Sequence, residues 1–295
     1  MRIGIASFFG SSSRRDFGFV AEFAACAEEL GFSTLYSPEH VVFFNSYDSK
    51  YPYSPDGSAP WGGRAELYDP LFVCAAAALA TTTLRFATSV LILPERPALL
   101  AAKEVMTLDH LSKGRFDLGI GIGWSQEEYE ALDMPWDRRG KRCDEYMEAM
   151  RCAWQNDPAT YKGTYVSFED VVLRPQPING TVPLIVGGDS PAAMRRAARL
   201  GDGWYGWWAS GEIEPHVEEF RSIMAAEGRE HDDNFDLRIG IPITRTADDG
   251  DTLAQIVAKA GRAEAVGADE FVIGPPVPAA NFEDQLRRWA EALIA

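Results

Sequence analysis

A glutamate and a histidine, Glu39 and His40, stand side by side just after the short apolar segment Thr34–Ser37. Imidazole gains and loses a proton near neutral pH, and a nearby carboxylate supports that exchange. If the segment is a strand, the pair lies at its C-terminal end, and His40 is the candidate for proton transfer. The alternative is a loop histidine that only hydrogen-bonds to the backbone.

A second candidate is the sequence Gly-Gly-Asp-Ser-Pro at residues 187–191. Ser190 and Pro191 are typical of an N-cap and of a first helical position. The free backbone N–H groups of such a helix start bind anions, and Gly187 and Gly188 let a ligand approach them. Three arginines on the same predicted helix would add positive charge: Arg195, Arg196 and Arg199. We therefore predict a phosphate site, with a capped helix and a solvated basic face as the alternative.

Glycines alternate with apolar residues at positions 119–123, and Trp124 follows them. Glycines at the C-terminal end of a strand let a flat ring approach the backbone closely. The same spacing also suits close packing inside a barrel, and both interpretations stay open. Four charged residues further on are expected to form only solvated helix faces: Glu127, Glu128, Arg138 and Arg139.

The stretch 38–68 is unusually long for a segment without regular structure, and such segments are commonly functional. It is rich in aromatic side chains, namely Phe43, Phe44, Tyr47, Tyr51, Tyr53 and Trp61. We expect it to form a lid or one wall of a substrate pocket. Its composition favours an apolar or ring-bearing small molecule.

The elements that must position these residues alternate between strand and helix patterns along the whole chain. Strand patterns lie at residues 3–8, 34–37, 84–93, 116–122, 184–186, 204–207, 237–243 and 270–273. Eight such units favour one closed (β/α)₈ TIM barrel over residues 1–295, with insertions after strand two and, at 157–180, before strand five. A doubly wound sheet is the rival, but its first turn would need Gly-x-Gly-x-x-Gly, and residues 9–13 read Phe-Gly-Ser-Ser-Ser.

The composition narrows the choice of partner. The formal net charge is −16, so nucleic acid and anionic membrane are not expected partners. The longest apolar stretch, residues 71–80, is half the length that a bilayer requires, and the first residues do not resemble a signal peptide. The four cysteines and four histidines show no metal-ligand spacing, so we expect no metal site. These features are typical of a cytoplasmic protein with reduced cysteines.

Taken in order, these pieces resemble the bacterial luciferase-like monooxygenase superfamily, and most of all its F420-dependent branch. The similarity covers nearly the whole chain and is carried by four stretches: Ser-Pro-Glu-His at 37–40, residues 84–91, Lys-Gly-Arg-Phe-Asp-Leu-Gly-Ile-Gly-Ile-Gly-Trp at 113–124, and Val-Gly-Gly-Asp-Ser-Pro at 186–191 followed by Asp-Gly-Trp at 202–204. Glu39 stands where aspartate is more usual. Trp124 stands where some dehydrogenases of the branch have a catalytic carboxylate, which argues against a sugar-phosphate substrate.

The resemblance implies a luciferase-like TIM barrel, often a homodimer, with coenzyme F420 or the alternative FMN at the mouth. It implies a proton-handling role for His40 and a non-prolyl cis bond between Ser89 and Val90 against the coenzyme ring. The residues that it implies for coenzyme binding are Glu39, Ser89, Val90, Ile122, Gly123, Trp124, Gly187, Gly188 and Ser190.

The leading hypothesis is an F420-dependent oxidoreductase that exchanges a hydride with a small organic substrate. The alternatives are an FMN-dependent monooxygenase supplied with flavin by a separate reductase, and a coenzyme-binding protein without catalysis.

Overall fold

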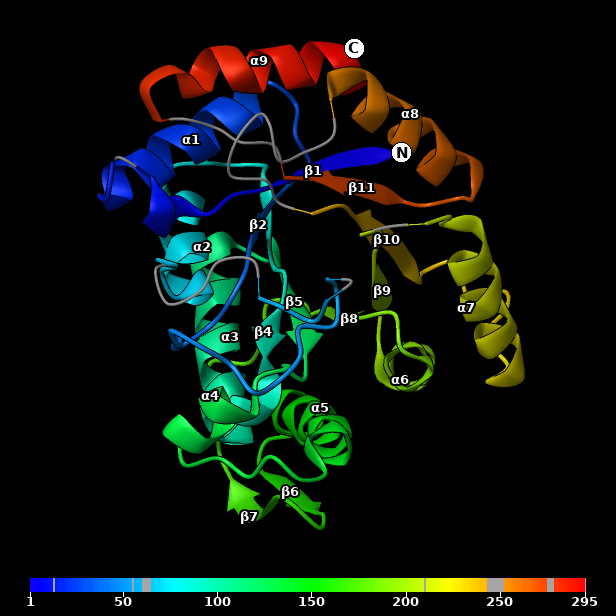
Figure 1. Ribbon diagram of the computed structural model, residues 1–295. Coiled ribbons are helices and arrows are strands. Elements are labelled where there is room, and N and C mark those ends of the chain that lie inside the picture. The colour runs from blue at the N-terminus through cyan, green and yellow to red at the C-terminus, as the bar shows by residue number, and fades with distance from the viewer. Residues whose placement is uncertain are drawn as a thin grey trace.

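The computed structural model describes residues 1–12, 14–54, 56–59, 65–209, 211–242, 252–274 and 279–294. Its centre is a closed barrel of eight parallel strands (Figure 1). The strands are β1 (Arg2–Ala6), β2 (Thr34–Ser37), β3 (Arg85–Thr88), β5 (Phe116–Gly121), β8 (Leu184–Gly187), β9 (Gly203–Trp207), β10 (Asp236–Gly240) and β11 (Glu270–Ile273). Pairing of β3 with β5 and of β1 with β11 completes the ring. The predicted TIM barrel is confirmed.

Helices surround the barrel (Figure 1). They are α1 (Phe17–Glu29), α2 (Pro70–Leu79), α3 (Ala98–Ser112), α4 (Gln126–Ala131), α5 (Arg139–Gln155), α6 (Pro191–Leu200), α7 (Glu214–Ala226), α8 (Leu253–Ala265) and α9 (Phe282–Leu293). Side chains of Asp16, Asp69 and Ser190 accept hydrogen bonds at the starts of α1, α2 and α6. In the described part of the chain, no helix combines the length and apolar character needed to cross a membrane.

Three predicted elements differ in detail. The third strand is interrupted: β3 ends at Thr88, and the two-residue strand β4 (Leu91–Ile92) pairs separately with β5. The seventh strand ends at Gly240, and its predicted last residue, 243, lies outside the described residues. The insertion at 157–180 forms an antiparallel pair, β6 (Ala159–Lys162) with β7 (Ser167–Val171), whose first strand contacts α5.

A buried charge cluster, here called the lower cluster, lies inside the barrel near the N-terminal ends of the strands. The sequence patterns did not predict it. Arg238 is 2% exposed and lies 2.7 Å from Asp117 Oδ2 and 2.8 Å from Asp236 Oδ2. Its Nη1 donates to the Tyr36 hydroxyl at 3.1 Å, and that hydroxyl donates to Glu270 at 2.7 Å. These groups satisfy one another near the N-terminal ends of the strands.

An apolar layer lies next along the barrel interior. It consists of Ala6, Tyr36, Ala87, Ile185, Tyr205 and Val272, with Val90 and Trp207 packed against it. The rings of Tyr36 and Tyr205 stack with centroids 5.6 Å apart. This layer separates the charge cluster from the residues at the C-terminal ends of the strands.

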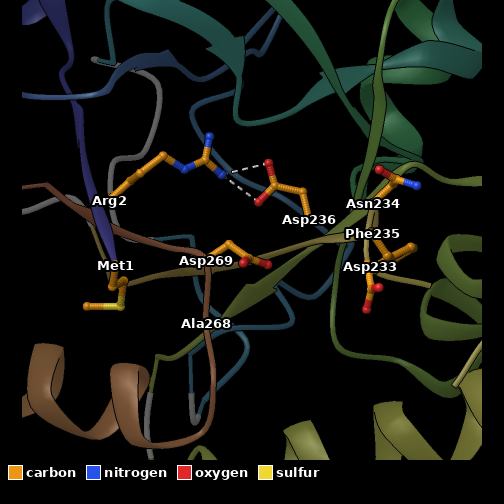
Figure 2. A pocket seen from close by; sticks show the side chains of 8 residues that line it. All are labelled: Met1, Arg2, Asp233, Asn234, Phe235, Asp236, Ala268 and Asp269. Atoms are coloured by element: carbon orange, nitrogen blue, oxygen red, sulfur yellow. Dashed lines mark hydrogen bonds and ion pairs between the residues drawn. The ribbon is translucent and has the colours of Figure 1, made fainter. Parts of the chain in front are cut away.

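A surface hollow of about 590 Å³ opens at the N-terminal ends of β1, β10 and β11 (Figure 2). Arg2 and Asp236 form an ion pair in its lining, with both carboxylate oxygens 2.7 Å from the guanidinium. Asp269 accepts the Leu237 N–H at 2.8 Å. Since these acids are already engaged and the candidate residues lie at the other end of the strands, this hollow is not the candidate site.

Candidate functional site

His40 and Glu128 form a close polar pair at the C-terminal end of the barrel. His40 Nδ1 lies 2.7 Å from Glu128 Oε2, and the two side chains are 12% and 1% exposed. The other carboxylate oxygen, Oε1, accepts the Val41 N–H at 2.6 Å. The expectation that Glu128 would lie on a solvated helix face is therefore wrong, because α4 turns this residue inward against the loop after β2.

The contact with Trp124 indicates which nitrogen of the His40 ring accepts a hydrogen bond. The indole Nε1–H, which can only donate, points to His40 Nε2 at 3.3 Å. Nε2 is therefore the acceptor, and Nδ1 carries the hydrogen that Glu128 receives. In this tautomer His40 presents a lone pair toward the barrel mouth and can accept a proton from a donor that replaces the indole.

Glu39, the sequence neighbour of His40, has a different set of contacts. Its Oε2 accepts the Ile92 N–H at 2.6 Å, and its Oε1 lies 2.5 Å from Arg96 Nη2. Burial raises the pKa of Glu39, and the Arg96 guanidinium opposes part of that rise. The carboxylate that supports His40 is thus Glu128, while Glu39 fixes β4 beside β2.

The first turn of α4 anchors the loop after β2. Glu127 Oε1 accepts the N–H groups of Asp48 at 2.7 Å and Ser49 at 2.9 Å. Burial would raise the pKa of Glu127, but hydrogen bonds led by the Ser49 N–H lower it to about 2. Ser125 caps the helix by accepting the Glu128 N–H at 3.2 Å. Two adjacent carboxylates therefore hold residues 41–49 against the barrel.

The predicted aromatic loop spans the barrel mouth as a continuous series of ring contacts. Tyr47 and Tyr51 pack on Trp124, with centroids 4.9 and 5.3 Å away. Tyr51 contacts Tyr53 at 5.5 Å, and Tyr53 contacts Trp207 at 6.0 Å on the opposite side. Burial raises the pKa of Tyr51 to about 12. Trp61, also predicted for this lid, lies outside the described residues.

The peptide bond between Ser89 and Val90 is cis, as the resemblance implied. Val90 lies over the two strand-end glycines: a Cβ added at Gly121 or Gly187 would come within 2.4 or 2.7 Å of its methyl groups. The barrel-packing interpretation therefore accounts for Gly121, and Gly187 packs against Val90 in the same way. The glycines make room for Val90, and Val90 in turn forms part of the mouth.

The Ser89 hydroxyl is a buried polar group at the mouth that lacks a hydrogen-bond partner. Among the described residues, Ser89 Oγ is buried and makes no hydrogen bond, although its backbone N–H donates to Ser37 O at 2.9 Å. Buried hydroxyl groups are normally hydrogen-bonded. An unused hydroxyl beside Val90 fits a bound polar ring such as a flavin or deazaflavin.

The predicted phosphate turn follows β8. Gly188 has φ of +109°, a conformation that favours glycine, and Ser190 Oγ accepts the Ala193 N–H at 3.2 Å. The predicted cap is confirmed, but the predicted contribution of Arg196 to a phosphate site is wrong. Its guanidinium is committed to Asp144 and to the Gly140 carbonyl at 2.9 Å.

Two further acids near the mouth have raised pKa values. Glu95 is 7% exposed, and neither of its carboxylate oxygens has a hydrogen-bond partner. Burial, with the charges of Glu128 and Glu39, raises its pKa to about 9. Burial also raises the pKa of Asp189 to about 6, against the effect of a hydrogen bond from Trp207 N at 2.8 Å.

Ile122 and Gly123 continue from β5 into the site. Tyr129 donates its hydroxyl hydrogen to Ile122 O at 2.7 Å. Gly123 has φ of +66°, and a Cβ there would lie 3.0 Å from Ile92. The residues that sequence reasoning missed are Glu128 as the partner of His40, and Glu95 and Asp189. The pattern Ser-x-x-Glu at 125–128 is a capping signal that could have placed Glu128 in a first helical turn.

Residues 1–294 match the family model described as luciferase-like monooxygenase. An uncharacterized protein of Mycobacterium tuberculosis is 31% identical over 273 residues, which cover 92% of this chain and 91% of that protein. An FMNH(2)-dependent dimethylsulfone monooxygenase of Pseudomonas putida is 31% identical over 211 residues, 67% of this chain and 55% of that protein.

A solved structure with the same fold is the coenzyme F420-dependent tetrahydromethanopterin reductase of Methanopyrus kandleri. Its TM-score is 0.74 at 16% identity, and the match covers 99% of this chain and 98% of the other. The match over nearly the entire chain, together with the barrel and its mouth residues, leads to one conclusion: this chain belongs to the luciferase-like monooxygenase family.

Proposed function

We propose that this protein is an F420-dependent oxidoreductase that exchanges a hydride between the deazaflavin coenzyme and a small organic substrate. The observation that carries the proposal is the arrangement of four residues at the C-terminal end of the barrel. His40, held by Glu128, lies just after β2. Ser89 and Val90 follow the adjacent strand β3, and their hydroxyl and side chain fit a coenzyme ring. A solved structure with this fold is named for F420.

His40 has the role of proton carrier. A substrate hydroxyl that takes the place of the Trp124 indole would donate to Nε2, and the imidazolium formed would be stabilised by the Glu128 carboxylate 2.7 Å from Nδ1. In the reverse direction the same nitrogen returns the proton. When bound, the coenzyme supplies hydride chemistry. The protein supplies the proton path and, through its aromatic loop, exclusion of water.

The residues proposed to hold the coenzyme form three groups. Ser89 and Val90 lie against the ring, Ile122, Gly123 and Trp124 line the β5 side, and Gly187, Gly188 and Ser190 bind the phosphate through backbone N–H groups. Glu39 acts on the coenzyme only through the placement of β4, because its oxygens are engaged by Ile92 and Arg96.

Titration of the purified protein with F420 and with FMN, followed by absorbance and fluorescence, tests the proposal. We expect saturable F420 binding that is tighter than FMN binding. Tight FMN binding without any affinity for F420 would reject the proposal.

The second candidate is an FMN-dependent monooxygenase that receives reduced flavin from a separate reductase. It is supported by the 31% identity to a relative named as an FMNH(2)-dependent monooxygenase. Oxygen consumption with chemically reduced FMN and a panel of small substrates separates the two functions. Substrate-dependent oxygen uptake favours this candidate, and its absence together with F420 binding favours the first.

The proposed assembly is a homodimer. The exposed face of α2 carries Phe72 and Leu79, which are 69% and 77% exposed, and Leu100 on the neighbouring α3 is 50% exposed. Exposed apolar side chains gathered on adjacent helices are typical of an association surface. Light scattering on the purified protein should give twice the chain mass.

A further inference from the structure

Asp189 is the acidic residue within the turn that is proposed to hold the coenzyme phosphate. Its Oδ1 accepts the Trp207 N–H at 2.8 Å, a bond that ties the carboxyl group to the end of β9. The bond fixes the acid at the barrel mouth between β8 and the start of α6. A negative side chain at this position is unexpected for an anion site, because anions favour positive surroundings.

Little positive charge offsets this acid in the part of the chain that the structure describes. No arginine or lysine there has a recorded ion pair with Asp189, and Arg196 is committed to Asp144 on α5. His216 is the described group whose charge lowers the pKa of Asp189, and its Nδ1 lies 3.1 Å from the Glu212 carbonyl oxygen. The turn therefore attracts a phosphate through backbone N–H dipoles and repels it through one carboxylate.

The loop after β2 covers this turn. The Tyr53 hydroxyl lies 3.9 Å from the position of a Cβ added at Gly188, and its ring contacts Trp207. The pKa of Tyr53 is raised by burial and further by the charge of Asp189, and Asp189 likewise raises that of Tyr205. Partial cover of this kind excludes water and strengthens interactions between charges.

The two candidate coenzymes differ in the charge of their phosphate. FMN ends in a phosphomonoester, which carries about 1.5 to 2 negative charges near pH 7. The phosphate of F420 lies within a diester linkage and is singly charged. We propose that Asp189 is a specificity-determining residue that disfavours the phosphomonoester of FMN relative to the phosphodiester of F420. This inference rests on the proposed function and extends it to coenzyme selection.

The test compares Asp189→Asn with the wild-type protein in binding titrations at pH 8 and low salt. The Asn side chain can still accept the Trp207 N–H, so the turn is preserved while the charge is removed. We expect the variant to bind FMN about tenfold more tightly than the wild type does, and F420 about threefold more tightly. The gain is larger for FMN because its phosphate carries more negative charge for Asp189 to repel. Riboflavin, which lacks the phosphate, should bind both proteins equally.

Two controls and one replacement variant accompany this test. Glu169→Gln, on the exposed β7, removes one charge elsewhere and should leave the FMN to F420 affinity ratio unchanged. Asp189→Ser replaces the first variant if that protein does not fold. At pH 5, where Asp189 is largely protonated, the difference between wild type and variant should disappear, because its pKa is about 6.

The outcomes separate the two proposals. An unchanged affinity ratio, or equal tightening of FMN and F420, overturns the role of Asp189 and leaves the proposed function intact. If the wild-type protein binds neither coenzyme in the same titrations, the proposed function fails and the role of Asp189 fails with it.

Discussion

At the N-terminal ends of the strands, Arg238 lies among Asp117, Asp236, Glu270 and the Tyr36 hydroxyl, and the partners satisfy one another. At the C-terminal ends, Glu128 supports His40, but the Ser89 hydroxyl and both oxygens of Glu95 have no hydrogen-bond partner. Both ends contain buried polar groups within one barrel. The difference is that the charged groups of the lower cluster pair with one another, whereas these described polar groups at the mouth have no hydrogen-bond partner.

The comparison predicts that the lower cluster controls stability. Arg238→Met removes the buried cation that Asp117, Asp236 and Glu270 share, and of the described cations only the more exposed Arg85 and Arg2 remain beside them. The free energy of unfolding should therefore fall by about 3–5 kcal/mol. Denaturant unfolding of the variant measures this loss, with Arg195→Met on the exposed face of α6 as the control. A loss below about 1 kcal/mol would contradict the view that the cluster is a structural unit.

The mouth, by contrast, should control turnover. His40→Ala removes the proton carrier, and we expect turnover to fall by about 10²- to 10⁴-fold. Spectral titration should show unchanged coenzyme affinity. His231→Ala, an exposed histidine, is the control. Unchanged turnover in His40→Ala would remove its assigned role.

The neighbours Glu127 and Glu128 separate proton chemistry from loop anchoring. Both hold backbone N–H groups of the loop after β2, but only Glu128 contacts His40. Losing the charged partner of an imidazolium costs about 1.5–3 kcal/mol, so Glu128→Gln should lower kcat about 10- to 100-fold. Glu127→Gln should leave kcat nearly unchanged and act on substrate KM. Equal losses of kcat would assign both residues to the loop alone.

Substitution of Glu95 has the smallest expected effect, and it is measured as a change in how stability depends on pH. Its folded pKa of about 9 lies above the ordinary value of 4.5, so the folded state keeps a proton that the unfolded state loses across this range. Stability therefore declines as pH rises from about 5 to 9. Glu95→Leu should flatten that decline and gain about 1–3 kcal/mol at pH 8. Thermal unfolding across this range, with exposed Glu219→Leu on α7 as the control, measures it; an unchanged slope would contradict the raised pKa.

Sequence patterns predicted the barrel well, because each strand and helix shows its own local periodicity. They also located the cap at Ser190 and the aromatic loop. They could not pair His40 with Glu128, because the two residues are 88 positions apart and their contact depends on how α4 packs against the loop. Adjacency in sequence favoured Glu39 instead, whose carboxylate forms an ion pair with Arg96.

The charge cluster was beyond the reach of pattern reasoning for a related reason. Asp117, Asp236 and Arg238 come from strands β5 and β10, and only closure of the barrel brings their side chains together. Alternation along one strand shows which residues point inward. It does not show which inward charges meet.

The two carboxylates that begin α4 fix residues 41–49 and leave the next part of the loop, with Tyr51 and Tyr53, joined to the barrel mainly by ring contacts. The loop is thus divided into a part anchored beside His40 and a part that would meet the substrate under the proposed function. If that function holds, sequence change beyond Ser49 would alter the choice of substrate without displacing His40. The enzyme is accordingly open to redesign by loop exchange, and natural relatives could diverge in substrate by the same route.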